Sequence, residues 1–80
     1  MTGNGLNEFV TLIRSLFREE DRSSINEDTD LRTLKEWSSL QTLIIVGEID
    51  NAYNVILGWE DMRKATNVRE LFTIVQSKRS

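Results

Sequence analysis

The sequence predicts an all-α fold, a small four-helix bundle with three longer helices and one short helix, and a long loop between the first and second helices. Three observations support this prediction. The chain has only 80 residues, it contains no proline, and apolar residues recur at helical spacing in three separate segments. A chain of this length forms at most one domain. We expect residues 1–5 to be a flexible N-terminus and residues 6–78 to be the helical domain.

The first helix is expected from Leu6 to Phe17 or Arg18. Its apolar residues share the spacing of one helical face, and they are Leu6, Phe9, Val10, Ile13, Leu16 and Phe17. A largely charged segment, REEDRSSINEDTDLRTLKEW, follows. We expect it to be a long loop that Ile25, Leu31 and Leu34 pin to the core. Loops of about twenty residues are uncommon in compact domains unless they have a function.

The second helix is expected from Ser39 to about Tyr53, with Ser38 as its N-cap. Ser38 and Gln41 have the spacing of a capping box, in which the serine oxygen accepts from the Gln41 backbone N–H while the Gln41 side chain reaches back. The apolar run LIIV at 43–46 is compatible with a buried strand. A helix is favoured because the helical period continues past the run to Tyr53.

Two helices are expected in the remainder of the chain. The short one runs from Glu60 to Lys64, which is about one turn. The last one runs to about Ser77, and Asn67 and Glu70 form its capping pair. The apolar face of the last helix consists of Val68, Leu71, Phe72, Ile74 and Val75.

The residue types that are missing exclude several kinds of chemistry. The chain has no His and no Cys, so it can form no Ser-His-Asp triad, no zinc thiolate site and no disulfide, and it supplies no thiol nucleophile. An enzyme therefore fits poorly. No apolar stretch approaches the roughly 20 residues of a membrane span, and MTGNGLNE lacks the features of a signal peptide. We expect an intracellular, cytoplasmic protein.

Charge is distributed unevenly along the chain. From Glu19 to Asp61 there are eleven acids and three bases, a net charge of −8, whereas the rest of the chain carries +5. The acidic middle should repel nucleic acid and attract basic protein surfaces. An ordinary solvated acidic loop is an equally good interpretation of this charge bias.

The segment NEDTD at 26–30 has some of the spacing of a calcium-binding loop. Leu31 stands where that loop needs Gly, however, and Trp37 stands where it needs Glu. We therefore interpret the segment as a loop with a capping role and predict no metal site there.

Ser38 and Ser39 are the remaining candidates for a chemical role. A serine at a helix N-terminus lies near unsatisfied backbone N–H groups and the positive end of the helix dipole, so a phosphate ester there is stabilised by about 0.3–1 kcal/mol. No residue in the chain is placed to activate the hydroxyl, so another protein must modify it. The alternative is that both serines are ordinary cap residues.

The stretch INEDTDLRTLKEWSSLQTLIIVGEIDNAYNVIL resembles the acyl carrier proteins in the order of its elements. It has an Asp-Leu step in a long loop, a serine and a leucine at the start of the second helix, and an aromatic residue and a valine at its exit. NVRELFTIV is similar to the start of the family's last helix, so the resemblance spans nearly the whole chain. In that family the serine of Asp-Ser-Leu carries 4′-phosphopantetheine. The matching residue is Ser39, and Ser38 replaces the Asp.

The resemblance also implies surfaces and a cavity. Glu48 and Asp50, with Leu40 and Ile44, are expected to recognise partners that have basic docking patches: a phosphopantetheinyl transferase, ketosynthases, acyltransferases or ligases. An acyl cavity is expected among Leu43, Val46, Gly47, Ile49, Tyr53, Ile56 and Phe72, which are otherwise ordinary core residues. Gly47 costs roughly 1 kcal/mol relative to Ala within a helix, and it is expected to make room for the cargo.

These observations predict a non-enzymatic, monomeric carrier that holds acyl groups as thioesters for fatty-acid, polyketide or related secondary lipid biosynthesis. A transferase that uses coenzyme A and magnesium would modify Ser39. Gln41 and Ile44 stand where the family commonly has acids, which favours a dedicated pathway over a general fatty-acid synthase. The alternative is an unmodified helical protein–protein interaction module with the same fold.

Overall fold

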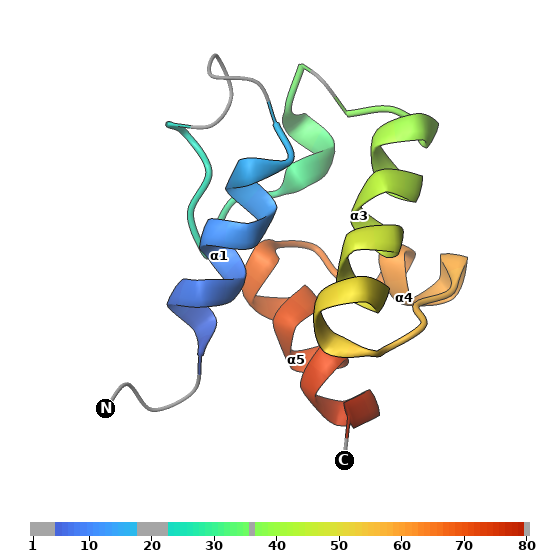
Figure 1. Ribbon diagram of the computed structural model, residues 1–80. Coiled ribbons are helices and arrows are strands. Elements are labelled where there is room, and N and C mark those ends of the chain that lie inside the picture. The colour runs from blue at the N-terminus through green and yellow to red at the C-terminus, as the bar shows by residue number, and fades with distance from the viewer. Residues whose placement is uncertain (1–4, 18–22, 36, 80) are drawn as a thin grey trace.

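The computed structural model describes residues 5–17, 23–35 and 37–79, and these residues form an all-helical bundle (Figure 1). Four α-helices and one 3-10 turn occur in them, and no β-strand. The elements are α1 (Leu6–Ser15), the 3-10 turn η1 (Leu31–Thr33), α3 (Ser39–Tyr53), α4 (Trp59–Lys64) and α5 (Val68–Arg79). The predicted fold class is therefore confirmed. None of the helices in these ranges is both long enough and apolar enough to span a membrane.

The helices enclose one hydrophobic core. Figure 1 shows α1 and α3 on opposite sides of the bundle, and α5 packs against α1 and α4. The Phe9 ring lies between two other aromatic rings, with its centroid 5.2 Å from that of Phe72 and 5.6 Å from that of Tyr53. Ile45 and Ile49 of α3 are fully buried in the same core. Large apolar contacts of this kind stabilise a small domain more than any other interaction.

Helix α1 ends two residues earlier than the apolar pattern predicts. The backbone N–H groups of Leu16 and Phe17 donate to the carbonyls of Ile13 and Arg14, three residues back, so the last turn tightens and the α-helix stops at Ser15. Phe17 is nevertheless buried, as the pattern requires. The alternative helix end at Arg18 lies outside the described residues.

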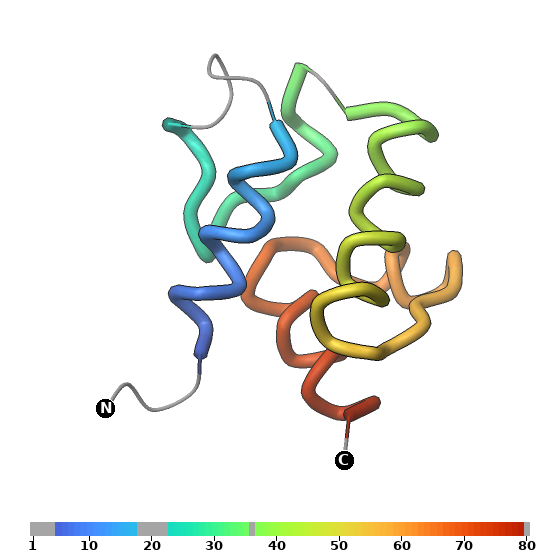
Figure 2. Tube along the Cα trace, viewed as in Figure 1, coloured from blue at the N-terminus to red at the C-terminus, as the bar shows by residue number. Residues whose placement is uncertain are grey.

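The predicted bounds of α3 are confirmed, and LIIV at 43–46 is helical. Asn54 ends the helix in the left-handed conformation, with φ 60° and ψ 40°, and its N–H donates to the Asp50 carbonyl at 2.9 Å. The chain then reaches α4 through residues 54–58, which form no regular secondary structure (Figure 2). Along it Val55 and Leu57 are buried, whereas Ile56 is exposed.

The remaining helices differ from expectation by one or two residues. Helix α4 begins at Trp59, where the Gly58 N–H donates to Asp61 Oδ2 at 2.9 Å. Helix α5 continues to Arg79. Asn67 Oδ1 accepts from the Glu70 N–H at 2.8 Å, as predicted. The Glu70 carboxylate accepts instead from the backbone and hydroxyl of Thr66, and these hydrogen bonds hold the Glu70 pKa below its usual value.

The long loop is pinned to the core as predicted, because Ile25 and Leu31 are buried and Leu34 is partly buried. Sequence patterns did not indicate the 3-10 turn η1. Asp30 caps that turn by accepting from the Arg32 N–H at 3.0 Å, and this hydrogen bond lowers the Asp30 pKa.

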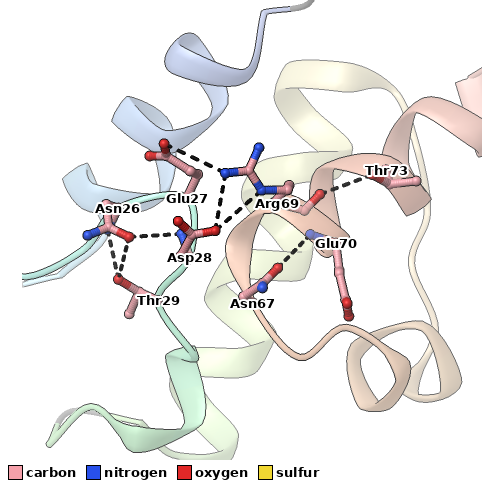
Figure 3. Close-up of polar contacts among 8 residues, drawn as sticks. All are labelled: Asn26, Glu27, Asp28, Thr29, Asn67, Arg69, Glu70 and Thr73. Carbon is pink, nitrogen blue, oxygen red and sulfur yellow. Dashed lines mark hydrogen bonds and ion pairs between the residues drawn. The ribbon is translucent and has the colours of Figure 1, made fainter.

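The loop also caps α5, a helix about forty residues away in sequence. The carbonyls of Glu27 and Thr29 accept from the first backbone N–H groups of α5, at 2.8 and 3.2 Å. Arg69 Nη2 lies 3.1 Å from Asp28 Oδ1 and 3.8 Å from Glu27 Oε2, and Figure 3 shows the three side chains pointing toward one another. The capping role predicted for NEDTD is thus confirmed, and it extends to a helix that is distant in sequence. No group of metal ligands occurs among the described residues.

We expect Arg69→Ala to lower the free energy of unfolding by about 1 kcal/mol, because it removes two ion pairs that join distant segments. Arg63→Ala is the matched control, since among the described residues Arg63 pairs with Glu60, one turn away on the same exposed helix surface. That control should cost at most about 0.5 kcal/mol. Urea denaturation at low and high salt measures both variants, and equal losses would contradict the assignment.

Candidate functional site

Ser38 caps α3 as predicted. Its backbone is extended, with φ −163° and ψ 172°, and its Oγ accepts from the Gln41 N–H at 3.1 Å. Its carbonyl accepts from both the backbone N–H and the hydroxyl of Thr42, each at 3.0 Å. The start of α3 is therefore set by three hydrogen bonds to one residue.

Ser39 is the first residue of α3, and it is exposed. Because Ser38 provides the cap, the Ser39 side chain is not required to stabilise the helix end. The backbone N–H groups of this first turn place the positive end of the helix dipole nearby. The structure thus places the predicted attachment residue where a second protein can reach it.

The other half of the predicted capping box does not form. The Gln41 side chain is buried, with 8% of its surface exposed, and its Nε2 donates to the carbonyl of Leu16 at 2.9 Å. That carbonyl lies at the end of α1, where no helical N–H remains to satisfy it. The Gln41 amide therefore joins the start of α3 to the end of α1, and this hydrogen bond satisfies a side chain that is itself buried.

A surface pocket of about 460 Å³ lies beside the two serines. Ser38, Ser39 and Thr42 line it from the start of α3, and Trp59, Met62 and Arg63 line it from α4. Arg32 and Trp37 complete the lining from the segment before α3. Its volume falls within the roughly 300–1,000 Å³ range of small-molecule sites.

Among the described residues that line this pocket, two are charged, and both are arginines. Arg32 Nε lies 3.2 Å from Asp30 Oδ1, and Arg63 Nη2 lies 2.6 Å from Glu60 Oε2. Sequence reasoning missed both arginines as site residues. No sequence signal indicated them, because they are 31 residues apart and only the fold brings them to one pocket.

An apolar ridge lies on the exposed face of α3, and we define it as Leu40, Leu43 and Ile44, which are 68%, 56% and 40% exposed. Their spacing of three and four residues places them on one helical face. Glu48 follows Ile44 by one turn and is partly buried, and Asp50 is exposed. Leu40, Ile44 and Glu48 therefore follow one another along one face of α3, whereas Asp50, two residues after Glu48, lies about 200° further round the helix.

The seven residues expected to line an acyl cavity are not gathered around one space. Ile49 and Phe72 belong to the core, and Val46 and Tyr53 are partly buried against it, whereas Leu43, Gly47 and Ile56 are exposed. A Cβ added to Gly47 would meet no atom within 4 Å. The glycine thus faces open space and makes no room inside the bundle. Leu43 and Val46 do line a pocket of about 80 Å³ with residues that include Leu57 and Met62.

No protein-family model matches the chain, and no curated protein is significantly similar to it in sequence.

We expect Ser38→Ala to lower the free energy of unfolding by about 1 kcal/mol, because the Gln41 N–H loses its capping acceptor. Ser38→Asp is the matched control. It should stay within a few tenths of a kcal/mol of the wild type, since a carboxylate accepts the same hydrogen bond and suits the helix dipole. Chemical denaturation monitored by circular dichroism measures both, and an unaffected alanine variant would show that the cap contributes nothing.

Asp61 gives α4 a pH-dependent anchor. The Gly58 N–H is the main cause of its lowered pKa, and Lys78 Nζ, 3.3 Å from Oδ2, lowers the pKa further. A carboxyl whose folded pKa is depressed contributes stability above its unfolded pKa of about 3.8 and loses it as pH falls through the folded pKa.

Wild type should therefore be more stable than Asp61→Asn at pH 7, by up to about 1 kcal/mol, and this advantage should vanish in acid below the folded pKa. Denaturation curves across this pH range measure the difference. Asp50→Asn removes an equal charge from an exposed position on α3. If both variants showed the same pH dependence, the contacts of Asp61 with Gly58 and Lys78 would not be its cause.

Proposed function

We propose that this protein is an acyl carrier protein that holds acyl groups on a 4′-phosphopantetheine arm attached to Ser39. One observation carries the proposal: Ser39 is an exposed serine at the first position of a helix that its neighbour caps, and exposed Leu40 follows it. This arrangement agrees with the resemblance of the Ser-Leu motif to the family. The proposed pathways are fatty-acid, polyketide or related secondary lipid biosynthesis.

The residues beside Ser39 fit a phosphopantetheine group. The adjoining pocket is large enough for a small molecule, and its two arginines suit a phosphodiester. When bound, the group would supply the thiol on which acyl thioesters form, and the chain has no Cys of its own. This protein's contribution is to present the serine, hold the start of α3 rigid and leave catalysis to its partners.

Attachment would be a phosphoryl-type transfer that a partner transferase catalyses with magnesium. The Ser39 oxygen attacks the phosphorus of coenzyme A that bears the pantetheine, and a new P–O bond forms. The anhydride P–O bond breaks, and adenosine 3′,5′-bisphosphate leaves. A base on the transferase takes the hydroxyl proton, because this chain contains no His and no carboxylate is among the described residues that line the pocket.

The outer side of α3 is the proposed docking surface. The apolar ridge supplies exposed apolar area next to the reactive serine, and Glu48 and Asp50 supply negative charge farther along the helix. Transferases, ketosynthases, acyltransferases or ligases with basic patches would complement this combination. Charge would guide the encounter, and the ridge would supply the buried apolar contact.

The second candidate function is an unmodified helical interaction module. The apolar ridge favours it, since exposed apolar residues at helical spacing form a binding face whether or not Ser39 is modified. The two candidates differ in one measurable property, which is the mass of the protein after treatment with a transferase.

Incubation with coenzyme A, magnesium and a broad-specificity phosphopantetheinyl transferase should add one phosphopantetheine to the wild type, as intact-protein mass spectrometry would show. Ser39→Ala should abolish the addition, because it removes the attacking oxygen. Ser38→Ala is the matched control and should still be modified. If Ser38→Ala blocked the addition and Ser39→Ala allowed it, the assigned serine would be wrong. An unmodified wild type would favour the interaction module.

A further inference from the structure

The pocket described above includes Ser39, the proposed attachment residue, in its wall. Ser39 is itself part of its lining, so a group joined to the serine oxygen begins inside the pocket. The far wall comes from α4, where Trp59 stands 20 residues further along the chain and is 61% exposed. A volume of about 460 Å³ is enough to receive a flexible chain with several rotatable bonds.

The pocket is lined by positively charged residues, although the middle of the chain is acidic. The segment from Glu19 to Asp61 carries a strong negative charge, yet the charged residues among the described lining of the pocket are Arg32 and Arg63. Each guanidinium has five N–H donors, and the ion pairs with Asp30 and Glu60 engage Arg32 Nε and Arg63 Nη2. Donors remain for a second anion, and arginine suits phosphate especially well.

The pocket also has two aromatic walls. Trp37 and Trp59 are the two tryptophans of the chain, and both line it. Indole faces pack against amide and methyl groups, which make up most of a pantetheine chain. A group that docks against the exposed Trp59 ring would bury apolar surface, which is favourable.

We propose that Arg32, Arg63, Trp37 and Trp59 hold the arm of Ser39 folded against the protein, with the arginines pairing with its phosphodiester and the indoles packing on its pantetheine chain. This inference rests on the proposed function. It assigns the resting position of the arm to the groove between α3 and α4, outside the bundle core.

The test compares amide and indole signals in ¹H–¹⁵N NMR spectra of the protein before and after modification. Two indole N–H signals are expected, one for each tryptophan, and Trp37→Phe and Trp59→Phe assign them. In the modified protein the Trp59 indole signal should move, because its ring contacts the arm. Trp37 is less diagnostic, since it lies two residues from Ser39 and senses the attachment itself.

Arg32→Ala and Arg63→Ala should each return the Trp59 indole signal toward its position in the unmodified protein. The ratio of docked to extended arm should fall roughly twofold to fivefold in each variant, which is the effect of one exposed ion pair. Lys64→Ala is the matched control, because Lys64 is an exposed cation on α4 that does not line the pocket. It should retain the full displacement. High salt should weaken docking in the wild type.

The outcomes separate this inference from the proposed function. An added mass with an unmoved Trp59 signal would overturn the docked arm and leave the carrier function standing. Equal effects of Lys64→Ala and Arg63→Ala would overturn the role of the arginines. Failure to add any mass would overturn both proposals.

Discussion

The packing of Ile45 and Ile49 into the core fixes the rotation of α3 about its axis, and the rest of the candidate site depends on it. Successive residues of an α-helix are rotated by about 100°, so these two buried positions determine which side chains of α3 face outward. With this rotation, Ser39 and the apolar ridge face outward, whereas Gln41 and Ile45 face the bundle. The Ser38 cap then makes Ser39 the first residue of the helix.

Contacts between the long loop and α5 position Arg32, which lines the pocket opposite α4. The loop carbonyls that cap α5, together with the Arg69 ion pairs, tie the segment before η1 to the last helix. Because η1 follows that segment directly, Arg32 is held within reach of α4. A domain of 80 residues has a small core and no disulfide, so polar ties between distant segments carry a larger share of its order. These contacts with α5 do not involve Ser39, which stays exposed.

Local features of the fold, including the place of Ser39 as the first residue of α3, were predictable from sequence. The bounds of α3, the cap at Ser38 and the core positions of α1 follow from the spacing of neighbouring residues. The direction of the Gln41 side chain was not predictable, because its partner is the carbonyl of Leu16 in another helix. Likewise, apolar residues occupy nearly every side of α3, so hydropathy could not tell that Leu43 is exposed while Ile45 is buried.

The sequence by itself therefore determined the helical class, the capped start of α3 and the place of Ser39 as its first residue, since capping and periodicity act over a few residues. Only the tertiary structure decided that two arginines and two tryptophans share a pocket with that serine. It also decided that the residues expected around one cavity lie partly in the core and partly on the surface. Such groupings depend on how the helices pack. Packing brings together residues that are far apart in the sequence, and no local sequence pattern marks them as neighbours.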